Sequence, residues 1–348
     1  MKQILFLLVV SLAMSTRLVH SAEAPALIER PASGNGPTQV SVGIWIVDIA
    51  NIDSAQQNFT ADIAMVLRWK DARLAHTGTG AVYYALDQIW TPGVSIANET
   101  SSVVRKLPES AEAEPDGTVL YRQRYVGSFT QPLRLQSFPF DRQAFRIHLV
   151  AIRYQPNEVV FVPDENWILD GLQQAAGISP SVTLPDWTIE KWDAKASTYA
   201  LTPGLQYSGY VFEFIASRNV QHYILKVILP LVLIVMMSWS VFWTEPTNSS
   251  TQFSIAVTSM LTLIAYRFAV DTQLPRLPYM TRLDVFFLIS TLLVFFSLIE
   301  VLITTILDNN QQTEGAKKLD RYCRVIVPVI FVMASIAIFF IRADNECK

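Results

Sequence analysis

The sequence predicts an extracellular, all-β antiparallel sandwich followed by a bundle of four membrane-spanning helices. Hydrophobic residues make up 51% and charged residues 16% of the 348 positions, which is more apolar than most soluble proteins but too polar for a chain that lies in membrane throughout. Up to residue 222 the chain is mixed in polarity and rich in period-two alternation. From residue 223 it becomes strongly apolar, so we place the boundary between two domains there.

The first 22 residues have the layout of a secretory signal peptide. Lys2 is followed by the apolar run 4–10, and small residues stand near Ser21 and Ala22. The apolar core is shorter than the ~20 residues that a membrane-spanning helix needs. We therefore expect residues 1–22 to be removed and the mature chain to begin outside the cytoplasm.

Residues 25–222 carry the signals of a sandwich. Between Phe59 and Trp69 apolar residues alternate with polar ones, and similar patterns recur at 40–46, 119–129, 145–151 and 210–216. Turn signals stand at 115–117 (Pro-Asp-Gly) and at 202–204 (Thr-Pro-Gly). Several such strands separated by turns predict an immunoglobulin-like antiparallel sandwich.

Residues 223–342 contain four apolar segments, at 224–243, 250–270, 283–307 and 325–341. About 20 helical residues cross the ~30 Å of a bilayer's hydrocarbon, so each segment is long enough to span or nearly so. The loop 308–324 would then be cytoplasmic, and it carries Lys317, Lys318, Arg321 and Arg324, as the positive-inside rule requires. These features predict a multi-pass protein of the plasma membrane, the inner membrane in a bacterium, with residues 25–222 outside.

One stripe of the second segment is neither uniformly apolar nor charged. It consists of Ser250, Ser254, Thr258, Leu261, Ala265 and Phe268, whose spacings of 4, 4, 3, 4 and 3 return to one face of a helix. This mixture predicts a helix that lines a water path, with Asp271 and Thr272 at its outer mouth, where carboxylates attract cations. The alternative is that Leu261 and Phe268 are ordinary helix-packing residues.

Enzyme motifs are absent from the sequence. His76, His148 and His222 have no metal-ligand spacing, and neither a nucleophile elbow nor a phosphate-binding glycine loop is present. We therefore expect no catalysis, no metal site, no cofactor and no nucleic-acid partner.

Residues 131–145 read QPLRLQSFPFDRQAF, which resembles the signature loop of the pentameric ligand-gated ion channels. Animal members close this loop with two cysteines; here Gln131 and Phe145 take those positions, so the chain is similar to the prokaryotic branch, which lacks the disulfide. Further stretches that resemble the family are WKDARL (69–74), IWTP (89–92), DGTV (116–119), SWSVFW (238–243) and LPRLPYMT (274–281).

The resemblance implies a homopentamer that binds a small-molecule agonist between neighbouring sandwiches, passes inorganic ions and lies in membrane lipid. Ile152 stands where many relatives have an aromatic residue of an amine-binding box, whereas Arg153 admits an anionic or carboxylate ligand. The candidate ligand-binding residues are Trp90, Ile152, Arg153, Tyr199, Tyr207 and Tyr210.

The resemblance also implies a coupling site where the two domains meet. Asp141 would face Arg218 in a partly buried ion pair, with Asp53 and the loop that contains Pro275 and Tyr279 pressed against it. The alternative for Asp141 is a turn-capping carboxylate without a role in gating.

These expectations combine in a ligand-gated, cation-selective ion channel that a small extracellular agonist opens, with apolar rings on the second helix as the gate. The alternatives left open are a proton-gated or an anion-selective channel of the same fold. A membrane-anchored extracellular ligand sensor is a further alternative.

Overall fold

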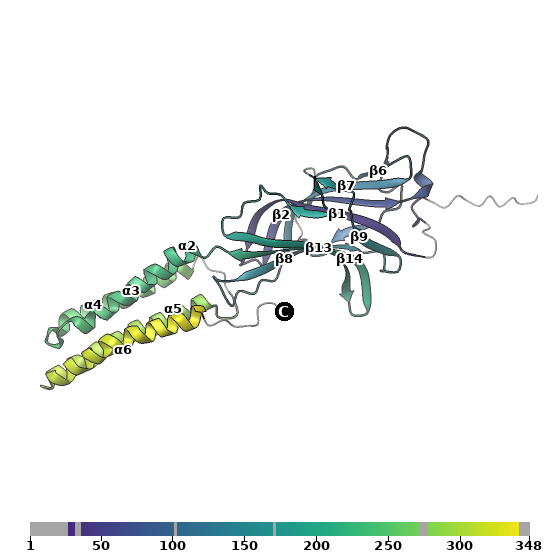
Figure 1. Cartoon of the computed structure of the whole chain (residues 1–348). Coiled ribbons are helices and arrows are strands. Elements are labelled where there is room, and N and C mark those ends of the chain that lie inside the picture. The colour runs from purple at the N-terminus through teal and green to yellow at the C-terminus, as the bar shows by residue number, and fades with distance from the viewer. Residues whose placement is uncertain (1–26, 32–35, 101–102, 170–171, 272–276, 341–348) are drawn as a thin grey trace, which may run out of the picture.

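The computed structural model describes residues 27–31, 36–100, 103–169, 172–271 and 277–340. The predicted signal peptide at 1–22 lies outside these ranges. The chain forms a β-sandwich from which long helices extend at one end (Figure 1). The domain boundary falls between Arg218, where the last strand ends, and Gln221, where the first helical turn begins.

Two sheets form the sandwich. The larger has the order β12-β1-β2-β7-β6-β3, with β5 also paired to β7 and β9 to β1; the smaller has the order β13-β14-β8-β4. The strands of the larger sheet are β1 (Thr38–Asp53), β2 (Asn58–Lys70), β3 (Val82–Ala85), β5 (Val104–Arg105), β6 (Ser110–Ala113), β7 (Thr118–Thr130), β9 (Val159–Pro163) and β12 (Ala176–Ile178). Those of the smaller sheet are β4 (Val94–Ile96), β8 (Arg142–Ala151), β13 (Trp187–Thr202) and β14 (Leu205–Arg218).

All five segments with period-two alternation are strands, and the pairing is antiparallel except that β9 and β12 run parallel to β1. A separate hairpin joins β10 (Ile168–Leu169) to β11 (Leu172–Gln173), and a 3-10 turn covers Ala72–Leu74. The turn at 202–204 joins β13 to β14, and Gly204 there has a φ of +89°, which a glycine adopts without strain.

Aromatic side chains fill the space between the two sheets. Phe59 of β2 contacts Phe145 of β8 and Phe214 of β14 edge to face, with ring centroids 5.5 and 5.7 Å apart. Phe145 and Phe214 stack at 4.9 Å, and all three rings are fully buried. Burying one such ring contributes about 1.5 to 3 kcal/mol. This cluster fixes the position of β8 and β14, the strands that lead to the domain junction.

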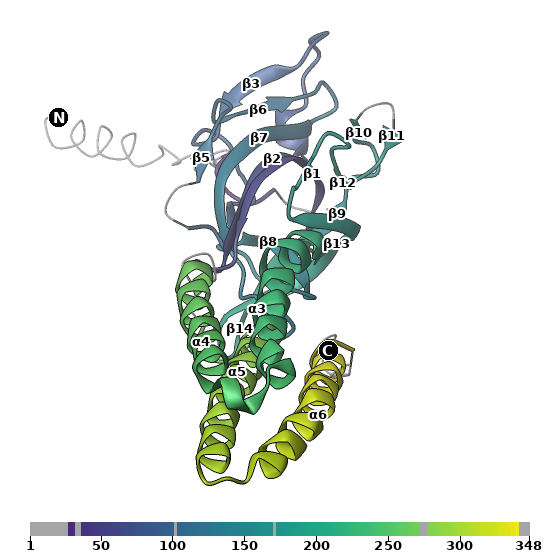
Figure 2. The ribbon, with the colours of Figure 1, turned by 90° about the vertical axis from the view of Figure 1, so that its left-hand side faces the viewer.

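Within the described residues, four helical segments are long and apolar enough to cross a membrane. The first consists of α2 (Gln221–Tyr223), a π turn (Ile224–Ile228), α3 (Leu229–Trp239) and a 3-10 turn (Ser240–Trp243). A short 3-10 turn (Pro246–Asn248) leads to α4 (Ser249–Asp271); α5 (Arg282–Asn309) and α6 (Thr313–Phe340) follow. Figure 2 shows these helices side by side beyond the end of the sandwich.

The predicted cytoplasmic loop at 308–324 is wrong in extent, because α6 begins at Thr313 and only residues 310–312 separate it from α5. The basic residues that suggested a loop lie on exposed or half-buried positions of α6. Ala316, Asp320 and Cys323 recur at helical spacing between them and are buried, so this stretch packs as a helix despite its charges.

Candidate functional site

The stripe predicted on the second span occupies one face of α4. Ser250, Ser254, Thr258 and Ala265 are exposed, and the exposed fractions of Leu261 and Phe268 reach 62% and 71%. The residues that α4 buries against its own subunit are Gln252, Ala256, Ser259, Leu263 and Val270.

At 100° per residue these buried positions lie opposite the stripe. The subunit therefore leaves the stripe uncovered. Asp271 is exposed as the last residue of α4, whereas Thr272 lies outside the described residues.

The predicted ion pair at the domain junction is present. Arg218 Nε donates to Asp141 Oδ1 at 2.8 Å, and Arg218 Nη2 donates to Asp141 Oδ2 at 3.1 Å. Their side chains are only 4% and 1% exposed, and the guanidinium group lies over the rings of Trp187 (4.2 Å) and Phe138 (4.8 Å). A bidentate contact of this kind orients both groups and offsets the free-energy cost of burying both charges.

The turn between β1 and β2 reaches this pair. Arg218 Nη2 also donates to Ser54 Oγ at 3.0 Å. Asp53 contributes indirectly, because its carboxylate accepts the backbone N–H groups of Ala55 and Gln56 and so shapes the turn that presents Ser54. Sequence reasoning chose the right turn but missed Ser54, whose hydroxyl group is the contacting one.

The signature loop itself touches the start of α5. Leu135 N donates to the Tyr279 hydroxyl group at 3.2 Å, and Arg282 N donates to Gln136 O at 3.0 Å. Tyr279 thus contacts the signature loop, whereas the expectation was that it presses against the ion pair; Pro275 falls outside the described residues. These contacts connect the sandwich to α5, the helix that follows α4.

Hydrogen bonds close the signature loop where relatives have a disulfide. Gln143 Nε2 donates to Arg134 O at 2.8 Å, and Arg134 N donates to Gln143 Oε1 at 3.1 Å. Gln143 Nε2 also donates to Asp141 Oδ2 at 2.9 Å. Gln131 Oε1 accepts Arg146 N at 3.1 Å, while Phe145 belongs to the aromatic core. Sequence reasoning did not find Gln143, because an amide on a strand carries no recognisable motif.

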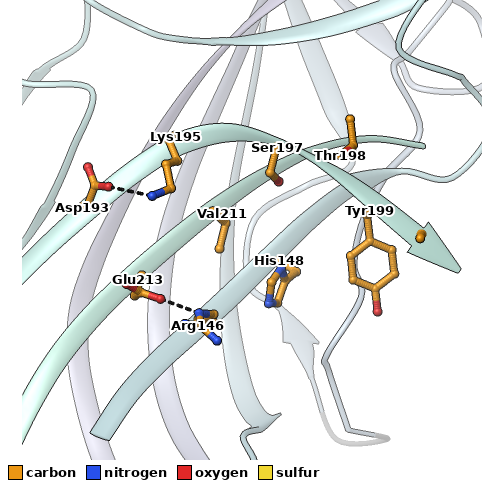
Figure 3. A pocket seen from close by; sticks show the side chains of 10 residues that line it. Arg146, His148, Asp193, Lys195, Ser197, Thr198, Tyr199, Val211 and Glu213 are labelled. Atoms are coloured by element: carbon orange, nitrogen blue, oxygen red, sulfur yellow. Dashed lines mark hydrogen bonds and ion pairs between the residues drawn. The ribbon is translucent and has the colours of Figure 1, made fainter. Parts of the chain in front are cut away.

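A cavity of about 520 Å³ lies on the smaller sheet (Figure 3). Its lining is polar and comes from three adjacent strands. The lining residues are Arg146 and His148 of β8, Asp193, Lys195, Ser197, Thr198, Tyr199 and Ala200 of β13, and Val211 and Glu213 of β14. A second cavity of about 430 Å³ shares Arg146, His148 and Tyr199 and extends to residues 97–99 and 130–132.

The charges in the first cavity are paired. Arg146 bonds to Glu213, Lys195 lies 3.4 Å from Asp193, and the rings of His148 and Tyr199 are 5.7 Å apart. Figure 3 shows His148 between Arg146 and Tyr199. Burial, and then the positive charge of Arg146, hold the pKa of His148 below its ordinary value, while Glu213 opposes them. These influences favour the neutral form of His148.

Of the six predicted ligand-binding residues, Tyr199 lines these two cavities. Tyr207 is paired with Tyr199 across β13 and β14, and Ile152 and Arg153 are exposed just after β8. The predictions for Trp90 and Tyr210 are corrected by the structure, because each side chain is only 1% exposed and cannot line an open site. Trp90 Nε1 donates to the Tyr154 hydroxyl group at 2.8 Å inside the core, and the alternation of β14 turns Tyr210 inward.

Comparison with known proteins gives the same division of the chain. The model of the neurotransmitter-gated ion-channel ligand binding domain matches residues 26–220, and that of the neurotransmitter-gated ion-channel transmembrane region matches residues 227–315. A proton-gated ion channel of Gloeobacter violaceus is 28% identical over 317 residues, covering 89% of this chain and 85% of the relative.

Two animal receptor subunits are also similar. The theta subunit of the mouse gamma-aminobutyric acid receptor is 27% identical and the chicken beta-4 subunit is 26% identical, each over 78% of this chain. The chain spans 42% and 56% of the length of these two subunits. The matched regions, the sandwich with its four helices and the Phe-Pro-Phe-Asp loop together establish that the chain belongs to the neurotransmitter-gated family of pentameric ligand-gated ion channels.

Proposed function

We propose that this ligand-gated ion channel is a cation-selective homopentamer in which α4 lines the pore. The observation that carries the proposal is the division of α4 into two faces. One face packs on its own subunit, and the stripe from Ser250 to Phe268 is left without cover. Five copies of such a stripe around an axis line a water path.

The stripe suggests where ions are held and where they are stopped. Rings of Ser254 and Thr258 hydroxyl groups support partly hydrated ions in the inner half. Rings of Leu261 and Phe268 form an apolar constriction in the outer half, from which water withdraws when the pore narrows. Five exposed Asp271 carboxylates at the outer end of α4 raise the local cation concentration, which is the basis for proposing cation selectivity.

We place the agonist site on the outer face of the smaller sheet, beside the β13–β14 hairpin. Tyr199 lines both cavities, which give room for a small polar molecule. Tyr207 pairs with Tyr199 on the hairpin, and Ile152 and Arg153 follow the neighbouring strand β8. The β14 strand that ends in Arg218 connects it to the junction, so movement of the hairpin is transmitted to the ion pair with Asp141. Membrane lipid surrounds the helices, and a bacterial source would place the protein in the inner membrane.

Voltage-clamp recording of the expressed protein tests the proposal. Application of amines and amino acids one at a time is expected to evoke a current that reverses near the equilibrium potential of the dominant cation in asymmetric salt. A current that follows the chloride gradient would establish anion selectivity instead. An extracellular sensor without a pore would give no current with any compound.

Proton gating is the second candidate. The Gloeobacter relative is a proton-gated ion channel, and the larger cavity holds His148 together with Glu213 and Asp193. Steps to acidic pH without any organic compound discriminate the two. A current evoked by protons alone favours this candidate, and an agonist-dependent current that acidification does not evoke rejects it.

A further inference from the structure

The helical bundle contains a group of buried oxygen atoms that nothing in the pore or the junction uses. Among the described residues, seven buried side-chain nitrogen or oxygen atoms lack a hydrogen-bond partner. Four of them are Gln252 Oε1, both carboxylate oxygens of Glu300 and Asp320 Oδ1. The three side chains come from α4, α5 and α6 and are 0%, 1% and 3% exposed.

This group lies toward the end of the bundle far from the sandwich. Glu300 is 18 residues beyond the start of α5, which is about 27 Å along the helix axis. Asp320 lies in the second turn of α6, which begins at that far end. The carboxyl groups of Glu300 and Asp320 interact directly, and the Gln252 side chain also reaches Asp320.

The neighbouring donors also bond to backbone carbonyl groups. Gln252 Nε2 donates to Val241 O at 3.3 Å and to Thr244 O at 3.0 Å. Arg324 Nε and Nη2 donate to Phe242 O at 3.2 and 2.7 Å, although the charge of Arg324 acts on Asp320, one helical turn away.

The other titratable neighbour is the buried thiol of Cys323. The stretch 241–244, between the first span and α4, contributes only backbone carbonyl groups to these contacts. No donor of the described residues therefore reaches Glu300.

Two adjacent carboxylates cannot both stay ionised in a dry, buried position. A metal ion is one way to neutralise them, but the described residues contain no group of three His, Cys, Asp or Glu side chains arranged to hold one. A proton needs no extra space and turns one acceptor into a donor. Both oxygens of Glu300 lack a hydrogen-bond partner, whereas only Oδ1 of Asp320 does, so we assign the proton to Glu300.

We propose that Glu300 is a proton-binding site of the folded transmembrane domain, whose protonated carboxyl group donates to Asp320 and so joins α5 to α6 beside Gln252 of the pore helix. Loss of this proton leaves an uncompensated charge between three helices. Alkaline pH then loosens the inner end of α4.

Infrared spectroscopy and thermal unfolding of the purified full-length protein test this proposal without any channel current. The wild type is expected to show the carbonyl stretch of a protonated carboxyl group at neutral pH, and Glu300→Gln is expected to lack it. Because the folded protein holds a proton that the unfolded chain releases, the Tm of the wild type falls with rising pH, by about 2 to 4 °C per pH unit. Glu300→Gln removes this dependence, because its amide cannot titrate.

Glu314→Gln is the matched control, since Glu314 is an exposed acid at the start of α6. This variant is expected to keep both the infrared band and the pH dependence of the Tm. If Glu300→Gln does not fold, alkaline titration of the wild type itself decides, because the Tm must stop falling at the pH where the band disappears. A wild type without the band, or a band that persists in Glu300→Gln, overturns the proposal.

Inside-out patches extend the test to gating, and this arm rests on the proposed channel function. Alkaline solution at the cytoplasmic face is expected to reduce the wild-type current severalfold and to leave the Glu300→Gln current unchanged. Equal inhibition of both proteins contradicts a role for the proton in the open state. A complete lack of current at every pH counts against the proposed function, whereas the infrared result decides the proton site independently.

Discussion

The two domains of this chain differ in where they place large apolar side chains: both bury some, such as Phe286 in the helices, but the helices also expose many of them. The sandwich encloses large apolar rings such as Phe59, Phe145 and Phe212, none of which is exposed. The helices enclose small polar residues such as Ser290 and Ser297, both 0% exposed. Large apolar side chains cover the outside of the helices, with exposed fractions of 56% for Leu292, 62% for Val325 and 80% for Phe340.

The difference follows from the solvent around each domain. In water, burying apolar area drives folding, so the sandwich places its rings inside. In lipid, apolar side chains gain little from leaving the surroundings, and small residues allow helices to approach closely. Ser290 Oγ donates to Phe286 O at 2.8 Å and Ser297 Oγ to Val294 O at 2.7 Å, so each hydroxyl group is satisfied within its own helix.

The first prediction compares an enclosed ring with an outward-facing leucine. Phe145→Ala leaves a void between the two sheets and is expected to lower the free energy of unfolding of the sandwich by about 3 to 5 kcal/mol. Leu292→Ala removes a side chain that faces lipid, and its effect is expected to stay within about 0.5 kcal/mol. Thermal unfolding of both variants in one detergent measures the contrast. Equal losses would show that Leu292 packs against another subunit.

The second prediction concerns the boundary between the two solvents. Asp141→Asn leaves Arg218 buried without its counter-charge and is expected to cost about 3 kcal/mol of stability. The same change is expected to raise the agonist concentration for half-maximal current, because the pair joins β14 to the signature loop. Glu112→Gln breaks a surface pair with Arg122 outside both cavities and is the control, with an expected cost of at most about 1 kcal/mol. A gating defect without a stability loss would assign Asp141 a signalling role alone.

The third prediction uses α4, where part of the exposed surface is proposed to face water rather than lipid. Leu261→Ser makes the apolar ring wettable and is expected to lower the half-maximal agonist concentration about tenfold, which corresponds to about 1.4 kcal/mol. Ile264→Ser changes an exposed residue off the stripe and serves as the control. Concentration–response curves measure both variants. Matching curves for the two variants would remove Leu261 as the gate.

The fold was predictable from the sequence wherever a single pattern, either period-two alternation or continuous high hydropathy, runs along a whole strand or helix. Alternation located all five strands proposed for the sandwich, and hydropathy located four spans. The start of α6 was not predictable in the same way, because residues 313–324 look like a charged loop when read for hydropathy alone. Their buried positions, Ala316, Asp320 and Cys323, depend on what α5 places opposite them.

The candidate site was predictable only in part for a related reason. The ion pair between Asp141 and Arg218 followed from motif positions, but the hydroxyl of Ser54 and the amide of Gln143 complete it through three-dimensional contacts alone. Trp90 and Tyr210 were assigned to ligand binding because aromatic residues suit that role. Burial decided otherwise, and a single sequence does not show which face of a strand the sheet encloses.

The last prediction concerns the polar face of the sandwich and has the smallest expected effect. Because burial and Arg146 lower the pKa of His148, the folded sandwich binds fewer protons than the unfolded chain just below the ordinary histidine pKa of about 6.5. The stability that neutral His148 contributes is therefore complete above this pH and is lost as pH falls toward the lowered pKa. His148→Gln is expected to reduce the change of Tm with pH in this window, by a few degrees at most. His76→Gln is the control, because it removes an unrelated histidine of the same domain.

The same variant separates stability from gating in acid. If protons opened the channel through the cavity, His148→Gln would also shift the pH of half-maximal current, because protonation beside Arg146 and Glu213 would then be the activating step. If His148→Gln flattens the pH dependence of the Tm but leaves that of the current unchanged, His148 is a half-buried base of the sheet and acid acts elsewhere. The cavity face of the sandwich would then be exposed to water without a role in gating. The stripe on α4 differs, because its exposed residues are proposed to form the gate.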